Sequence, residues 1–145
     1  MVAQDTGIDV DRFTQLYFDI LNRHDLNSFR HILAEAYTNH SRMGTVRGMD
    51  AFQRLMAGVY EAFPDLHYVL DDIVVQGERI VYRYHATGTH QRPLFGLAAT
   101  GRRIEVESAE IDRFEDGKLV ESWNYADLMG LLRQLGAITL SQDDA

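Results

Sequence analysis

Apolar residues recur every three to four positions in three stretches of the first half of the chain, the spacing of helices that bury one face. The first helix is expected from about residue 9, and a short second one from Leu26 to Leu33. The third follows Gly48 and ends at Phe63, because the residue before a proline is disfavoured in the helical conformation. Three helices are therefore predicted before Pro64.

After Pro64 the apolar period shortens to about two residues, and β-branched and aromatic residues become frequent. This pattern predicts antiparallel strands over residues 68–75, 79–90, 103–114 and 118–125. Asp116-Gly117 matches a two-residue hairpin turn, because both residues tolerate positive φ. That turn would set Phe114 opposite Leu119 and Glu110 opposite Trp123.

Helices followed by a run of strands predict an α+β fold, in which N-terminal helices pack on a cone-shaped, curved antiparallel sheet. A final helix from Leu128 would end at Gly136. A strongly bent sheet covered by helices encloses a cavity, so a ligand pocket is expected. The length fits a single domain, 1–145, with an ordered core at about 9–137.

The composition narrows the choice of partners. Lys and Arg number 14 against 22 Asp and Glu, and this net charge of −8 repels phosphate, so neither nucleic acid nor an anionic membrane is expected as a partner. The chain has no cysteine, which excludes thiolate nucleophiles and cysteine-based metal sites. It has neither a basic segment followed by an apolar run at its start nor a long apolar stretch, so a cytoplasmic protein is expected.

Asp127 is the first candidate for chemistry, because it lies where the last strand ends and the last helix begins. Next to Trp123, a carboxylate at the mouth of the cavity would be partly desolvated and able to exchange protons near neutral pH. An Asp directly before a leucine-rich helix is also a common N-cap. The residues alone favour the capping role.

Glu110 and Asp112 lie on the same side of one predicted strand, and Glu121 is expected near Asp112 across the hairpin. Two carboxylates held close together can divide acid and base roles between them. The alternative is a solvated face, on which these acids are surface charges near Arg113 and Lys118. The pattern favours that alternative, because like charges usually face each other only where water screens them.

Histidines and one arginine are further candidates. His40 is expected in a polar loop and His85 on the second strand, and either could orient a carbonyl or move a proton. Arg83 shares a strand face with His85 and could hold a carboxylate or an enolate oxygen. A structural role is the alternative for each of them.

The first and third helices supply candidate cavity residues, Tyr17, Phe52 and Met56, which could equally be plain core. The histidines lack metal-ligand spacing, so no metal is expected. The sequence also lacks a Gly-x-Ser-x-Gly nucleophile motif, a glycine-rich phosphate loop and a dinucleotide fingerprint. Acyl-enzyme hydrolysis, nucleotide hydrolysis and hydride transfer therefore lose their usual support.

Several strings, in this order and spacing, resemble the SnoaL-like polyketide cyclases of the nuclear-transport-factor-like superfamily over residues 9–137. They are Tyr37-Thr-Asn-His40, Ala62-Phe-Pro-Asp-Leu66, Gly77-Glu-Arg-Ile-Val-Tyr-Arg83, Gly88-Thr-His90, Phe95-Gly-Leu-Ala-Ala-Thr-Gly101, and Glu115-Asp-Gly-Lys118 followed by Glu121, Trp123, Asp127 and Gly130-Leu-Leu-Arg-Gln-Leu-Gly136. The Phe-Pro-Asp-Leu block and the Trp-x-x-x-Asp block with its Gln-Leu-Gly end are specific in combination.

The resemblance implies a cone-shaped α+β barrel with a deep apolar pocket, a homodimer through the sheet, and an intramolecular aldol condensation that needs no cofactor. It also implies that Asp127 is the acid–base residue. Arg113 occupies the strand position where a histidine partner is expected, so His40 or His85 would take that place. His40 or Arg83 would then stabilise the enolate, and the other lining candidates, including Trp123, would bind the ligand.

Two other readings of the resemblance stay open, because one fold hosts many functions. The protein could bind a hydrophobic small molecule without catalysis. It could instead be an isomerase or an epoxide hydrolase, the latter using Arg83 with Asp127 and Glu110 around a water molecule. The lining of the pocket would separate an enzyme from a binding protein.

Overall fold

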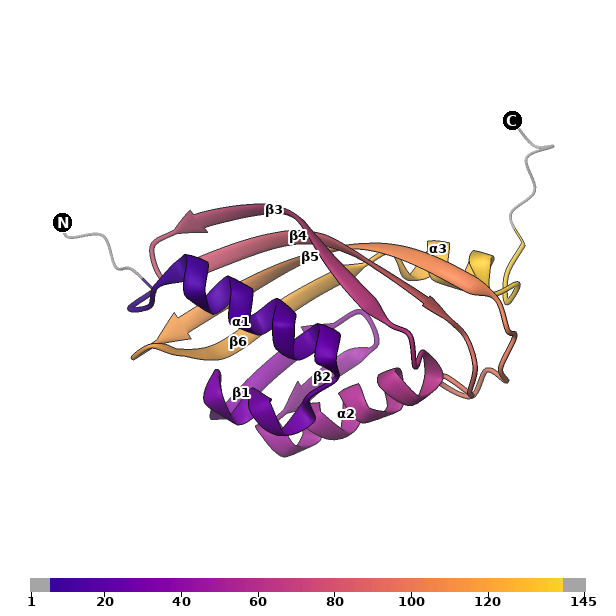
Figure 1. Cartoon of the computed structure of the whole chain (residues 1–145), viewed down its shortest axis with the longest axis horizontal. Coiled ribbons are helices and arrows are strands. Elements are labelled where there is room, and N and C mark those ends of the chain that lie inside the picture. Colours follow the sequence, from indigo (N-terminus) through magenta and orange to yellow (C-terminus); the bar gives the residue numbers. More distant parts are fainter. Residues whose placement is uncertain (1–5, 140–145) are drawn as a thin grey trace.

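Six strands form one curved sheet in the order β2-β1-β6-β5-β4-β3 in the computed structural model, which describes residues 6–139. They span Leu33–Ser41 (β1), Gly44–Arg47 (β2), His67–Gln76 (β3), Arg79–Thr89 (β4), Arg103–Glu115 (β5) and Lys118–Ala126 (β6). The sheet arches over α1 (Val10–Arg23) and α2 (Met49–Ala62), and α3 (Leu128–Gln134) lies at one end (Figure 1). The predicted α+β class is confirmed, although the sheet stays open within the described residues.

Local chemistry explains the ends of the helices. The side chain of Asp9 accepts a hydrogen bond from the Arg12 amide at 3.1 Å and caps α1. Helix α2 ends just before Phe63, the residue that precedes the proline. The predicted second helix is wrong in type and length, because a 3-10 helix, η1, spans only Leu26–His31 and Leu33 already belongs to β1.

Strands β1 and β2 are absent from the predicted elements, and His40 lies on β1 and not in a loop. The pattern concealed β1 because a polar residue, Asn39, takes a buried position in it. Strand β1 runs parallel to β6, with His40 beside Trp123, whereas the four predicted strands are antiparallel to one another. The sheet is therefore mixed.

The hairpin between β5 and β6 is confirmed, with positive φ at both Asp116 and Gly117. Phe114 pairs with Leu119, as predicted. The predicted pairing of Glu110 with Trp123 is wrong by one residue, because a bulge shifts the register next to Phe114. Asn124 is the residue opposite Glu110.

An aromatic core joins the helices to the sheet. Phe114 of β5 meets Phe13 of α1 edge to face, with ring centroids 4.9 Å apart. Phe52 of α2 meets Phe29 and Tyr37 in the same way. These contacts hold α1 and α2 over one face of the sheet, here called the inner face; the opposite side is the outer face. Within residues 6–139, no helix is long and apolar enough to cross a membrane.

Candidate active site

A cavity of about 230 Å³ lies between the inner face of the sheet and the helices. Its apolar lining consists of Leu21, Met43, Phe52, Leu55, Met56, Val59, Phe63, Leu66, Ala86, Leu94, Phe95, Ile104, Val106, Ala126, Leu128 and Leu131. Its polar lining consists of Tyr17, Asn39, Ser41, Tyr68, Tyr84, Ser108, Glu110 and Asn124. An apolar cavity with a few convergent polar groups is the usual form of a small-molecule site.

Glu110 is the only formally charged side chain that lines this cavity in the described part of the chain, and it is 5% exposed. The Tyr17 hydroxyl donates to its Oε1 at 2.8 Å, and the Asn124 amide donates to its Oε2 at 3.2 Å. The Tyr84 hydroxyl donates to Oε2 at 3.4 Å and accepts from Asn124 at 2.7 Å. Neutral donors, and not an ion pair, therefore hold this carboxyl group at the cavity wall.

Asp112 lies behind Glu110, two residues further along β5, and is 0% exposed. The Ser122 hydroxyl donates to its Oδ1 at 2.6 Å, while its buried Oδ2 has no hydrogen-bond partner within residues 6–139. Burial raises the pKa of Asp112 well above its ordinary value, and the charge of Glu110 raises it further.

The two tyrosines that contact Glu110 are dependable hydrogen-bond donors. Burial raises the pKa of Tyr17 and of Tyr84 well above the ordinary tyrosine value, with the charge of Glu110 as the second cause. Both hydroxyls therefore stay protonated near neutral pH and can donate to a carboxylate or to a ligand oxygen.

Strand alternation explains why these groups face the cavity. Phe114 of β5 is buried on the inner face, and side chains two and four positions earlier must share that face. Asp112 and Glu110 occupy those positions. The solvated-face alternative from the sequence is wrong, because both acids are buried.

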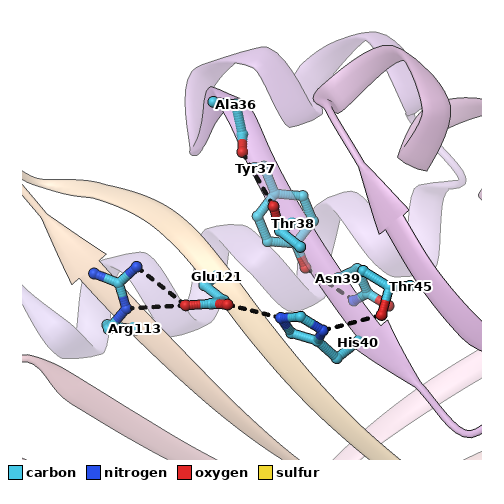
Figure 2. Close-up of polar contacts among 8 residues, drawn as sticks. All are labelled: Ala36, Tyr37, Thr38, Asn39, His40, Thr45, Arg113 and Glu121. Carbon is cyan, nitrogen blue, oxygen red and sulfur yellow. Dashed lines mark hydrogen bonds and ion pairs between the residues drawn. The ribbon is translucent and has the colours of Figure 1, made fainter.

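His40 and Trp123 lie on the outer face, where their rings stack with centroids 5.4 Å apart. Glu121, which was expected near Asp112, accepts a hydrogen bond from His40 Nε2 at 2.7 Å and two from Arg113, at 3.1 and 3.3 Å (Figure 2). The hydrogen bond from His40, and then those from Arg113, lower the pKa of Glu121. This cluster joins β1, β6 and β5 away from the cavity.

Arg83 and His85 border a shallow depression of the outer face. His85 donates to Asp71 at 2.7 Å, and this hydrogen bond raises the pKa of His85. Arg83 is exposed. Because Arg83 and Glu110 lie on different faces of the sheet, the arrangement around one water molecule that epoxide hydrolysis would need does not form.

Asp127 caps α3: its Oδ1 accepts a hydrogen bond from the Gly130 amide at 2.9 Å. The carboxylate lies so close over the backbone that a Cβ on residue 130 would overlap it. Asp127 is exposed and borders the outer depression, while its neighbour Leu128 lines the cavity. Capping is thus observed, and the acid–base role of Asp127 stays a prediction.

Four of the nine candidate residues line the cavity, namely Tyr17, Phe52, Met56 and Glu110. The other five, His40, Arg83, His85, Trp123 and Asp127, are absent from its lining, and their roles toward a ligand stay predictions. Sequence reasoning missed Tyr84 and Asn124. The alternation of buried residues along β4 predicts that Tyr84 faces the cavity. The position of Asn124 opposite Glu110 depends on the bulge, which no local sequence pattern predicts.

Residues 6–139 contain no group of three or more His, Asp or Glu side chains placed to hold a metal ion. The homodimer expected from the resemblance stays a prediction.

The family model for SnoaL-like polyketide cyclase matches residues 11–135. Aklanonic acid methyl ester cyclase DnrD of Streptomyces peucetius and the cyclase of the same name, DauD, of Streptomyces sp. strain C5 are each 31% identical over 93 residues. That segment covers 63% of this chain, but only 63% of DnrD and 57% of DauD, so less than two thirds of each relative is spanned.

Solved structures with the same fold resemble this chain. TsrD from Streptomyces laurentii is 31% identical, with a TM-score of 0.82 over 90% of this chain and 99% of its own. A SnoaL-like polyketide cyclase from Agrobacterium tumefaciens, at 19% identity and a TM-score of 0.76 over 89% of this chain and 99% of its own, shares the fold. The family match across most of the chain, on the open curved sheet described above, shows that this protein belongs to the SnoaL-like polyketide cyclases.

Proposed function

We propose that the cavity is the active site of a cyclase that closes a ring in a hydrophobic, carbonyl-containing small molecule by intramolecular aldol condensation. Glu110 is the acid–base residue in this proposal. One observation carries it: within residues 6–139, Glu110 is the single carboxyl group lining an apolar cavity, and neutral donors hold it there.

The reaction transfers one proton from the substrate to Glu110 and then back to the substrate. The Glu110 carboxylate takes a proton from the carbon next to a carbonyl, and the resulting enolate carbon attacks a second carbonyl carbon of the same molecule. The new alkoxide then takes the proton back from Glu110. The apolar walls fold the ligand so that the two carbons meet.

Tyr84 is placed to stabilise the enolate oxygen. Its 3.4 Å hydrogen bond to Glu110 is the longest of the three, so a ligand oxygen can replace it at small cost. The Asn124 amide, which donates to both Tyr84 and Glu110, holds that hydroxyl beside the base. A preorganised donor aimed at developing negative charge is a large source of rate enhancement.

The test compares Glu110→Gln with Asp127→Asn, using aklanonic acid methyl ester first because two relatives are named for it. Asn still caps a helix, so Asp127→Asn is a matched control that removes one carboxylate from the outer side. We expect Glu110→Gln to lose turnover by roughly 10²–10⁴ and Asp127→Asn to keep it. The opposite result would transfer the acid–base role to Asp127.

A binding protein without catalysis is the second candidate. The mainly apolar lining favours it, as does the fact that both oxygens of Glu110 already accept hydrogen bonds from the chain. A hydrophobic ketone or ester that raises the melting temperature of the wild type, and is recovered unchanged after incubation, would support this function. Recovery of an isomer in place of a cyclised product would indicate an isomerase.

A further inference from the structure

The proposed reaction assigns no role to Asp112, a buried acid next to Glu110. It shares the inner face of β5 with Glu110 but does not line the cavity. Only Oδ1 has a hydrogen-bond donor, Ser122, and Oδ2 is buried without a partner within residues 6–139. An ionised Asp112 would leave charge on a buried oxygen that no donor of the described residues stabilises, which is costly in an apolar interior.

The groups facing this pair of acids carry no positive charge in the described part of the chain. They are Tyr17 of α1, Tyr37 of β1, Tyr68 of β3, Tyr82 and Tyr84 of β4, and Ser122 and Asn124 of β6. Burial raises the pKa of all five tyrosines, so they too are neutral near pH 7. Two adjacent negative charges without a cation repel each other strongly, so the pair retains one proton.

We propose that Asp112 is a positioning residue that keeps this proton, so that Glu110 presents the single negative charge of the pair to the ligand. The distribution of donors supports the assignment, because three hydrogen bonds from other residues reach the Glu110 carboxylate, whereas among the described residues only Ser122 donates to Asp112, and a proton held by Asp112 can be donated to Glu110. The role of Asp112 in catalysis rests on the proposed role of Glu110, whereas the location of the proton can be measured without any substrate.

Carbon-13 NMR of the side-chain carboxyl groups in the full chain tests where the proton is. Near pH 7 we expect the Asp112 carbon at the position of a neutral acid and the Glu110 carbon at that of a carboxylate. Glu110→Gln removes the neighbouring charge and lowers the pKa of Asp112. Ser122→Ala removes the donor that favours the ionised form and raises that pKa. An Asp112 carbon at the ionised position near pH 7 would overturn the proposal. So would a pH titration in which the pKa of Asp112 changes by the same amount and in the same direction in both variants.

Kinetics of Asp112→Asn give an independent outcome. Asn copies the neutral acid, so we expect kcat and KM within about threefold of wild type, far from the roughly 10²–10⁴ loss expected for a missing base. A loss of that larger size in kcat alone would mean that Asp112 itself transfers the proton, which would overturn the proposal. If wild type and variants all lack turnover, the proposed function fails, and the NMR result still decides the location of the proton.

Discussion

Glu110 and Glu121 lie on adjacent strands of one sheet, yet they face opposite sides and have opposite kinds of partner. Glu110 accepts hydrogen bonds from neutral hydroxyl and amide groups in an apolar cavity. Glu121 accepts hydrogen bonds from His40 and from the Arg113 guanidinium on the outer face, and its pKa is lowered. A carboxylate paired with a cation is a poor base, whereas one held by neutral donors stays available to a proton.

The contrast follows from a single step along a strand. Asp112 and Arg113 are neighbours on β5, but Asp112 is buried beside Glu110 on the inner face, whereas Arg113 forms an ion pair with Glu121 on the outer face. Exposure and charge partner, more than residue type, therefore distinguish the proposed base, Glu110, from the ion-paired Glu121.

Replacing either glutamate by glutamine gives the largest expected difference. Glu110→Gln removes the proposed base and lowers kcat by roughly 10²–10⁴. Glu121→Gln leaves kcat within about threefold of wild type, because its partners lie outside the cavity. Steady-state assays on the same substrate measure both, and equal losses would abolish the distinction between the two faces.

The pH dependence of stability separates the buried acid from the exposed ones. The unfolded chain loses the Asp112 proton near pH 4, but the folded chain keeps it to higher pH because its pKa is raised. The free energy of unfolding of the wild type therefore decreases as the pH rises from about 4 to the folded pKa of this group. Asp112→Asn lacks this contribution.

Urea unfolding of both proteins at a series of pH values measures it. The stability of Asp112→Asn relative to wild type should grow with pH above about 4. Glu110→Gln is the control. It lowers the pKa of Asp112 and so reduces the pH dependence of the free energy of unfolding. A stability difference that stays constant with pH would contradict a raised pKa of Asp112.

Asp127→Ala should cost about 1 kcal/mol of stability, because α3 loses its N-cap. Asp127→Asn should cost only a few tenths, since Asn caps a helix about as well as Asp. Urea unfolding near pH 7 compares the two variants. Losses of the same size in Asp127→Ala and Asp127→Asn would show that the carboxylate does more for stability than cap α3.

Glu121→Gln gives the smallest expected effect on stability, about 1 kcal/mol or less near neutral pH. Because the folded pKa of Glu121 is lowered, its contribution is present above the unfolded pKa of about 4.3 and is lost as the pH falls through the folded value. The difference from wild type should therefore shrink in acid. A difference that grows in acid would contradict the ion-pair assignment.

Much of the fold followed from local pattern alone. Helical periodicity located α1, α2 and α3, the Asp116-Gly117 turn located the β5–β6 hairpin, and alternation located four strands. These features depend on residues close together in the chain, whose conformational preferences and apolar spacing act locally. Local pattern did not predict β1 and β2. Strand β1 is stabilised by pairing with β6, a distant segment, and β2 pairs with β1.

The site divided in the same way. The sequence supplied Tyr17 and Glu110 and placed Asp112 on the same strand face as Glu110, but it could not tell whether that face meets water or the core. Only the tertiary structure decided this, because a helix packed over the inner face buries the acids, and a one-residue bulge exchanges Trp123 for Asn124 opposite Glu110. Burial and register depend on contacts between distant segments, so no single stretch of the chain specifies them.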